Sequence, residues 1–266
     1  MRVAKAHAYG NDFLLMEASE VPAGLDRPDL ARRICDRHRG IGADGLMLYT
    51  VDETGGPVPR ASMRLLNADG SRSEVSGNGV RCLAVLLAMR VAGAGDVIVD
   101  TEAGEKRLTL LDRQGSRFIF RAAMGEPTDL RQQTLDVLGA PLDVITLRVG
   151  NPQCVVLGPP TDARLHSIAR ALATHPAFPE GTNVELAEVE RPDLVRILIW
   201  ERGVGPTFAS GTGACAAAVA AAAYGGAARD AIVASPGGEQ RVEWTRDGLF
   251  LTGAAEVTMD GEWLAG

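Results

Sequence analysis

Two stretches of the chain, EVSGNGVRCLAVLLAM at residues 74–89 and FASGTGACAAAVAAAA at residues 208–223, read as near copies of each other. Each one places Ser-Gly-polar-Gly directly before a long apolar run that contains a cysteine. Serine is a favoured helix N-cap, and glycine permits a tight turn before a helix. Because both runs are apolar nearly all round, they predict helices buried inside their domains, over 79–93 and 213–226.

Similar elements surround the two serines, Ser76 and Ser210, which lie half a chain length apart. Further helical patterns occur at 26–38, with Asp26 as the N-cap, and at 162–175. Short runs of β-type residues, bounded by Gly, Pro, Asp and Asn, predict the strands. These runs are Phe13–Met16, Leu46–Tyr49, Ala61–Leu66, Val97–Asp100, Lys106–Leu111, Phe118–Arg121, Ile145–Val149, Val155–Leu157, Val195–Trp200, Ala231–Ala234, Gln240–Trp244 and Leu249–Thr252.

The repeated order of elements predicts an α+β fold of two pseudo-symmetric halves, each with strands wrapped around one central helix. We expect the N-terminal half to cover residues 1–116, with 258–266 returning to it, and the C-terminal half to cover 117–257. A functional site is expected at the seam of the two halves, where the two glycine turns could serve one ligand.

Composition narrows the class of partner. The net charge of −7 argues against nucleic acid or an anionic membrane surface as the main partner. The four cysteines form no C-x-x-C pair and histidine is scarce, so we expect no metal site, reduced thiols and a cytoplasmic protein. No signal peptide or membrane span is expected. The sequence does not determine the oligomeric state, and a homodimer is compatible with it.

The glycine turns have two interpretations. Taken singly, each is explained by helix capping alone. Taken together, they offer two helix N-termini whose free N–H groups and partial positive charge suit one anionic group. GTGACA at 211–216 also fits the loose dinucleotide pattern G-x-G-x-x-A. However, Asp230, the candidate ribose ligand, precedes the next strand instead of ending it, so we reject that interpretation.

Other polar residues cluster where the predicted strands end. Glu201 and Arg202 follow an apolar strand and offer partners for an ammonium and a carboxylate group. Asparagines in loops are common turn formers, but together with this pair and the glycine turns they predict a site for a zwitterionic amino acid. The asparagines at strand ends are Asn11, Asn67, Asn151 and Asn183.

The chain resembles the diaminopimelate epimerase family. The motifs that carry the resemblance occur in family order over nearly the whole chain. They are GNDF, RGIGADGL, MRLLNADGS, SGNGVRC, GNPQ, GTNVE, ERGVGPT, SGTGACAAAVAA and PGG with the following LTG. The resemblance implies two pseudo-symmetric α/β halves and interconversion of LL- and meso-diaminopimelate without pyridoxal phosphate or metal, one base removing the Cα proton and an acid on the opposite face returning one.

The resemblance also implies residue roles. The substrate would be bound by Asn11, Asn67, Asn151, Asn183, Glu201 and Arg202, and its α-carboxylate would be held by Gly77, Asn78, Gly211 and Thr212. The family's two catalytic cysteines, however, are Ser76 and Ser210 here, and the histidine of its GNPH motif is Gln153, which we expect in a supporting position. Pro206 is a further departure.

The two serines leave open whether the protein catalyses the reaction of the family. A thiol near a helix N-terminus ionises close to neutral pH, whereas a hydroxyl normally needs a neighbouring base. The motifs show no such base at either turn. The alternatives are a protein mutated at both positions to trap substrate, a natural Ser/Ser branch of the family, and a binding protein that has lost the chemistry. A sister isomerase of proline or hydroxyproline fits NADGS and ERGVG less well.

Overall fold

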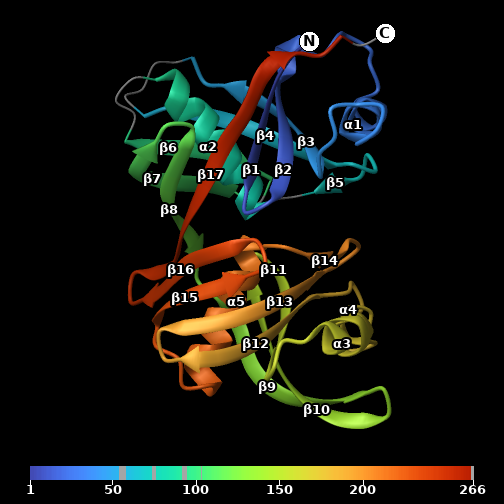
Figure 1. The fold of residues 1–266 in the computed structure, drawn as a ribbon, viewed down its shortest axis with the longest axis vertical. Helices are drawn as coiled ribbons and strands as arrows, with labels where there is room; N and C mark the ends of the chain where they lie inside the picture. The colour runs from blue at the N-terminus through green and yellow to red at the C-terminus, as the bar shows by residue number, and fades with distance from the viewer. Residues whose placement is uncertain (54–57, 74–75, 92–94, 103, 265–266) are drawn as a thin grey trace. The chain divides into compact units, whose positions relative to one another are not determined.

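The computed structural model of the chain divides into two compact units, shown from one side in Figure 1. It describes residues 1–53, 58–73, 76–91, 95–102 and 104–264. Unit 1 comprises Met1–Ala122 and Ala254–Gly266, and unit 2 comprises Ala123–Gly253. Both divisions fall inside strands, β8 (Arg117–Gly125) and β17 (Gly248–Glu262). The boundaries expected from the sequence lie at the start of β8 and within β17.

Unit 1 is built on a run of paired strands. Strand β2 is parallel to β3, β3 is antiparallel to β4, β4 is parallel to β6, and β6 is antiparallel to β7. Strand β1 lies antiparallel to β2 on one side and to β17 on the other, so the two ends of the chain pair with each other. The strand bounds are β1 Arg2–Ala8, β2 Asn11–Glu17, β3 Gly45–Val51, β4 Arg60–Asn67, β5 Arg72–Ser73, β6 Asp96–Thr101 and β7 Gly104–Gln114.

Unit 2 repeats this pairing element by element. Strand β11 is parallel to β12, β12 is antiparallel to β13, β13 is parallel to β15, and β15 is antiparallel to β16. Strand β10 lies antiparallel to both β11 and β9, as β1 does to β2 and β17. The bounds are β9 Thr128–Val137, β10 Ala140–Val149, β11 Asn151–Leu157, β12 Asn183–Arg191, β13 Leu194–Glu201, β14 Gly205–Thr207, β15 Asp230–Ser235 and β16 Gly238–Thr245. The α+β fold of two pseudo-symmetric halves is confirmed.

One buried helix lies among the strands of each unit. Helix α2 (Gly77–Arg90) and helix α5 (Gly211–Tyr224) bury nearly every side chain of their first two and a half turns. In unit 2, α5 packs against β10, β11, β12 and β13, and its alanines allow the strands to approach closely. Both helices begin two residues before the predicted spans, and residues 92–94, at the predicted end of the first, lie outside the described residues.

The remaining helices also correspond between the units. Helix α1 (Arg27–Cys35) lies between β2 and β3, and its counterpart lies between β11 and β12. That counterpart is continuous from α3 (Asp162–Arg164) through a π-helical turn (Leu165–Ala169) to α4 (Arg170–Ala173). A short 3₁₀ helix (Ala18–Glu20) follows β2. Asp26 is the N-cap residue of α1, as expected, although its side chain makes no capping hydrogen bond.

All twelve predicted strand segments lie inside observed strands, but several strands have no counterpart in the prediction. Strand β9 reads TDLRQQTLDV and is largely polar, while β12 reads NVELAEVER, a composition typical of helices. Pairing with neighbouring strands, which is remote in sequence, determines their state. Strand β1, rich in alanine, and the short β5 and β14 are the others. In the described part of the chain, no helix is long and apolar enough to cross a membrane.

Candidate active site

Ser76 is the N-cap residue of α2. Its backbone is extended, and its Oγ accepts a hydrogen bond of 3.1 Å from the N–H of Gly79. Because the oxygen is the acceptor, the hydroxyl proton stays available for another partner. Gly77 and Asn78 form the first turn of α2, where the backbone N–H groups have no acceptor within the helix. The expected capping role of the serine is confirmed.

Ser210 occupies the same place on α5. Its Oγ accepts a hydrogen bond of 3.2 Å from the N–H of Gly213 and lies 3.5 Å from Oγ1 of Thr212. Ser210 is 5% exposed, so the hydroxyl is nearly removed from bulk solvent. Gly211 and Thr212 supply the first turn here. The two serines therefore have the same backbone geometry and the same capping bond in their respective units.

In unit 1, three of the predicted binding residues meet at the edge where β2 and β3 begin and β4 ends. Asn11 donates from Nδ2 to Asp44 at 2.7 Å and accepts at Oδ1 from Nδ2 of Asn78 at 3.2 Å. Asn67, the last residue of β4, lies opposite Gly45 and donates to Oγ of Ser71 at 2.9 Å. The hydrogen bonds fix the amide of Asn11, so its orientation is set before any ligand binds.

A network of charged side chains adjoins this edge of the sheet and includes Asp44, the partner of Asn11. The carboxylate of Asp12 accepts hydrogen bonds from the guanidinium of Arg37 and forms an ion pair with Nζ of Lys5 at 2.9 Å. The guanidinium of Arg37 also forms an ion pair with Asp44 at 2.8 Å. Burial alone would raise the pKa of Asp12, but the hydrogen bonds from Arg37 and Lys5 outweigh it and hold that pKa below its usual value. Asp12 therefore stays ionised and holds Arg37 against Asp44, the partner of Asn11.

Unit 2 assembles its predicted residues in a similar way. Gln153 is buried and donates from Nε2 to Oδ1 of Asn151 at 2.6 Å, and it lies beside Asn183 in the parallel pairing of β11 with β12. Oδ1 of Asn183 accepts the backbone N–H of Arg202 at 2.9 Å. The guanidinium of Arg202 donates to the carbonyl of Glu180, also at 2.9 Å. Asn151, Gln153, Asn183 and Arg202 thus form one connected cluster, with Glu201 at the end of β13.

Glu185 belongs beside this cluster, although the sequence singled out only Asn183 from its motif. It lies two residues along β12 from Asn183, on the same face of the strand, and is completely buried. Within the described residues, neither carboxyl oxygen has a hydrogen-bond partner. Burial, and secondarily the nearby charge of Glu201, raises the pKa of Glu185 well above its usual value. Its position was available from the sequence only as the alternation of residues on β12.

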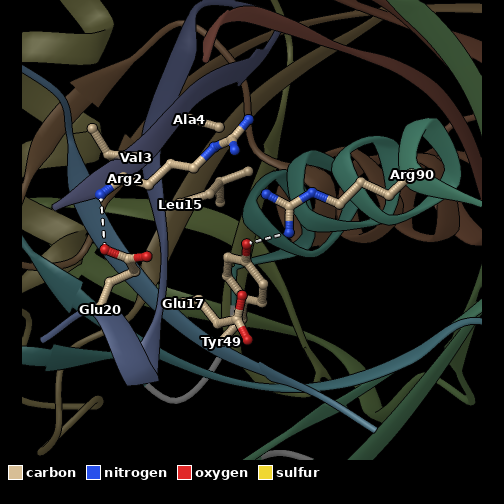
Figure 2. A pocket seen from close by; sticks show the side chains of 8 residues that line it. All are labelled: Arg2, Val3, Ala4, Leu15, Glu17, Glu20, Tyr49 and Arg90. Carbon is tan, nitrogen blue, oxygen red and sulfur yellow. Dashed lines mark hydrogen bonds between the residues drawn. The ribbon is translucent and has the colours of Figure 1, made fainter. Parts of the chain in front are cut away.

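A small hollow in unit 1, shown in Figure 2, is unrelated to these residues. It has a volume of about 30 Å³, room for about one water, and is too small for an amino acid. Arg90 donates to the hydroxyl of Tyr49 at 2.8 Å on one side of it, and the backbone N–H of Arg2 donates to Glu20 at 3.1 Å on another. None of the predicted site residues lines it.

Solved structures with the same architecture define the class of fold. A predicted epimerase from Pseudomonas aeruginosa aligns with a TM-score of 0.74 at 16% identity, covering 100% of this chain and 99% of that one. A probable proline racemase from Agrobacterium radiobacter K84 aligns with a TM-score of 0.72 at 16% identity, covering 100% and 93%. The chain therefore shares the fold of these two proteins.

Sequence comparison narrows this class to one family. The family model for diaminopimelate epimerase matches residues 3–129 and 145–258. Enzymes named diaminopimelate epimerase from Desulforudis audaxviator and Pelotomaculum thermopropionicum are each 39% identical, over 99% of this chain and 99% of their own. One from Synechococcus elongatus is 37% identical over 98% and 97%. The chain belongs to the diaminopimelate epimerase family and is therefore an enzyme of the isomerase class.

Proposed function

We propose that the protein interconverts LL- and meso-diaminopimelate by proton transfer at Cα, without a cofactor, in the synthesis of lysine and peptidoglycan precursors. The observation that carries the proposal is the pair of helices α2 and α5. They occupy equivalent places in the two units, and each begins with a capping serine followed by glycine. Together with family membership, this pair supports a site that treats the two faces of Cα alike. We propose the cytoplasm as the location, and a homodimer as the assembly to test by solution mass.

Binding would use the polar groups already described. A carboxylate suits the N–H groups of Gly77 and Asn78 on α2 and of Gly211 and Thr212 on α5, because helix N-termini favour anions. The carboxylate of Glu201 suits the substrate ammonium group, and the guanidinium of Arg202 suits a second carboxylate.

The four asparagines would bind the remaining polar groups of the substrate. Amides offer a donor and an acceptor on one side chain, so they can serve both ends of a zwitterion. In unit 1 these residues are Asn11 and Asn67, and in unit 2 they are Asn151 and Asn183. Gln153 would support the second pair through its hydrogen bond to Asn151.

Ser76 and Ser210 would carry the proton transfer. One serine, as its alkoxide, would take the Cα proton on one face, and the hydroxyl of the other would give its proton to the opposite face, so that hydroxyl and alkoxide exchange places. Both oxygens accept from a helix N–H, which stabilises developing negative charge on them. A hydroxyl is nevertheless a much weaker acid than a thiol, so we expect turnover well below that of a thiol-based epimerase.

Deuterium incorporation tests the proposal directly. Pure protein incubated with LL-diaminopimelate in D₂O should introduce deuterium at Cα and produce the meso isomer, both followed by mass spectrometry and chiral separation. The matched control is Ser76→Ala with Ser210→Ala, which should bind substrate but lose exchange. Thermal shift with each isomer measures binding separately. Binding without exchange would establish a ligand-binding protein instead, and exchange of proline in place of diaminopimelate would establish a sister isomerase.

A further inference from the structure

Glu185 is a completely buried acid that has no role in the reaction proposed above. It lies in the middle of the β12 pairings, opposite Val155 on β11 and Ile199 on β13, and faces the buried helix α5. Placing a carboxyl group there without a hydrogen-bond partner costs free energy that an apolar residue would avoid. Such a group calls for a functional explanation, and its neighbours supply one.

Gly213 shows where the carboxyl group points. A Cβ built on Gly213 would lie 2.6 Å from Oε1 of Glu185 and 3.2 Å from Oγ of Ser210. The carboxyl group and the serine hydroxyl therefore both adjoin the same small space beside the first turn of α5. The N–H of Gly213 donates to Oγ of Ser210, so the hydroxyl proton is directed elsewhere, and the long 3.5 Å contact with Oγ1 of Thr212 is one place for it. A carboxyl oxygen without a partner is a suitable acceptor for it.

We propose that Glu185 is the proton relay of Ser210, passing a proton between its carboxyl group and the hydroxyl that faces substrate. The proposal rests on the proposed function and deepens it. When Ser210 acts as a base, Oγ takes the Cα proton as its own proton moves to the Glu185 carboxylate. A substrate carbanion and a neutral Glu185 result, and the serine is regenerated. When Ser210 acts as an acid, both transfers reverse.

The surroundings of Glu185 favour its neutral form at rest. Helix α5 carries no charged side chain between Gly211 and Tyr224. The titratable groups that face Glu185 are Glu201 at the end of β13 and the Cys154 thiol on β11, whose own pKa is raised by burial and by Glu185. Within the described residues, no cation is among the groups that shift the pKa of Glu185. Protonated Glu185 is the form in which Ser210 acts as the acid, and ionised Glu185 is the form in which Ser210 acts as the base.

Isomer-specific exchange tests the relay. Removing a positioned acid or base costs about 10²–10⁴-fold in rate, so Glu185→Gln should slow Cα exchange by at least about 10²-fold for the stereoisomer that presents its proton to Ser210. Glu185→Asp, which keeps an ionisable group, should restore part of the rate and the pH profile. Glu190→Gln is the matched control, because it makes the same change at the exposed end of the same strand and should leave exchange unchanged.

The variant Ser210→Cys distinguishes a proton-relay role of Glu185 from a purely structural role. In a Ser210→Cys background the base ionises without help, so adding Glu185→Gln should cost no more than about threefold. An equal loss in both backgrounds would overturn the relay, because it would show that Glu185 only supports the fold. If the unmodified protein exchanges the Cα proton of neither isomer, the proposed function fails. If it exchanges both isomers and Glu185→Gln changes neither rate, only the relay is overturned.

A titration without substrate decides the point even in an inactive protein. The thiol introduced by Ser210→Cys should ionise in two coupled steps when Glu185 is present and in a single step with Glu185→Gln, as read from its alkylation rate against pH. The four native cysteines are buried, which hinders their alkylation, and burial raises the pKa of Cys35 and Cys82 to about 12. Superimposable single-step curves would overturn the relay.

Discussion

The first turns of α2 and α5 have the same geometry but different neighbours. The pairing registers make Met47 on β3 the counterpart of Glu185 on β12, since Phe13 lies opposite Gly45 and Gln153 opposite Asn183. A Cβ on Gly79 would lie 2.7 Å from Cε of Met47, where the equivalent atom on Gly213 meets a carboxyl oxygen.

At these two turns the internal repeat preserves shape more strictly than chemistry. At both positions a long side chain from the neighbouring strand, β3 or β12, fills the space beside the cap. In unit 1 that side chain is apolar, and Phe13 adds a second apolar contact at 3.6 Å from the same point. In unit 2 it is an acid. Ser76 and Ser210 thus form the same cap but have neighbours of different chemistry.

Restoring thiols should produce the largest effect and should expose this difference. The double change Ser76→Cys with Ser210→Cys is expected to raise Cα exchange by about 10²–10⁴-fold, because a thiolate at a helix N-terminus needs no helper. Of the single changes, Ser76→Cys should gain more, since among the described residues the space beside its cap is filled by Met47, whereas Ser210 has Glu185 there. Exchange of each isomer in D₂O measures both.

Equal gains at the two positions would contradict the comparison. A double variant that binds substrate and stays inactive would show that the divergence extends beyond the two serines. Gln153 would then be the next position to change, because it stands where the family motif has histidine and donates directly to Asn151.

Part of this site could be predicted from the sequence. The Ser-Gly-x-Gly pattern located both caps, and the apolar runs located both buried helices, because these signals are local. The strand residues Asn11, Asn67 and Glu201 were also placed correctly at strand ends. Their hydrogen-bond partners were not predicted, because Asp44 and Asn78 approach Asn11 only through folding.

Glu185 shows why the rest could not be predicted. Glutamate is rarely buried without a partner, so any sequence-based expectation places it in solvent. The strand that carries it, β12, has the composition of a helix, and only pairing with β11 and β13 fixes its alternation. The motifs show no base beside Ser210, and the position of Glu185 next to the first turn of α5 depends on contacts that are remote in sequence.

Adding a methyl group beside each cap should produce the next largest effect, again unequal. Gly213→Ala brings Cβ to 2.6 Å from a buried carboxyl oxygen, which has little room to move, and should lower the free energy of unfolding by about 1–3 kcal/mol. Gly79→Ala meets the terminal methyl of Met47, the end of a flexible side chain, and should cost less than about 1 kcal/mol. Urea denaturation of both variants measures the difference. A larger loss for Gly79→Ala would contradict the assignment of neighbours.

The pH dependence of stability should produce the smallest effect, with opposite signs in the two units. The pKa of Glu185 is raised by burial, so the folded protein keeps a proton that the unfolded chain releases above its ordinary pKa. Stability attributable to Glu185 therefore falls as pH rises from about 4.5, the ordinary value, toward the raised pKa. Glu185→Gln removes this penalty. Its melting temperature should rise relative to the unmodified protein as pH increases, by a margin near zero at pH 4.

Asp12 provides the contrast in unit 1. Burial opposes ionisation of Asp12, but Arg37 and Lys5 hold its pKa below the usual value, so the folded protein releases a proton that the unfolded chain keeps. The stability it contributes is present above the ordinary carboxyl pKa and is lost as pH falls through the lowered one. The melting temperature of Asp12→Asn should thus lie below that of the unmodified protein at neutral pH, with the gap closing in acid. Parallel pH profiles for Asp12→Asn and Glu185→Gln would mean that the two buried carboxyl groups differ in position only, and the chemical asymmetry of the two units would then have to be abandoned.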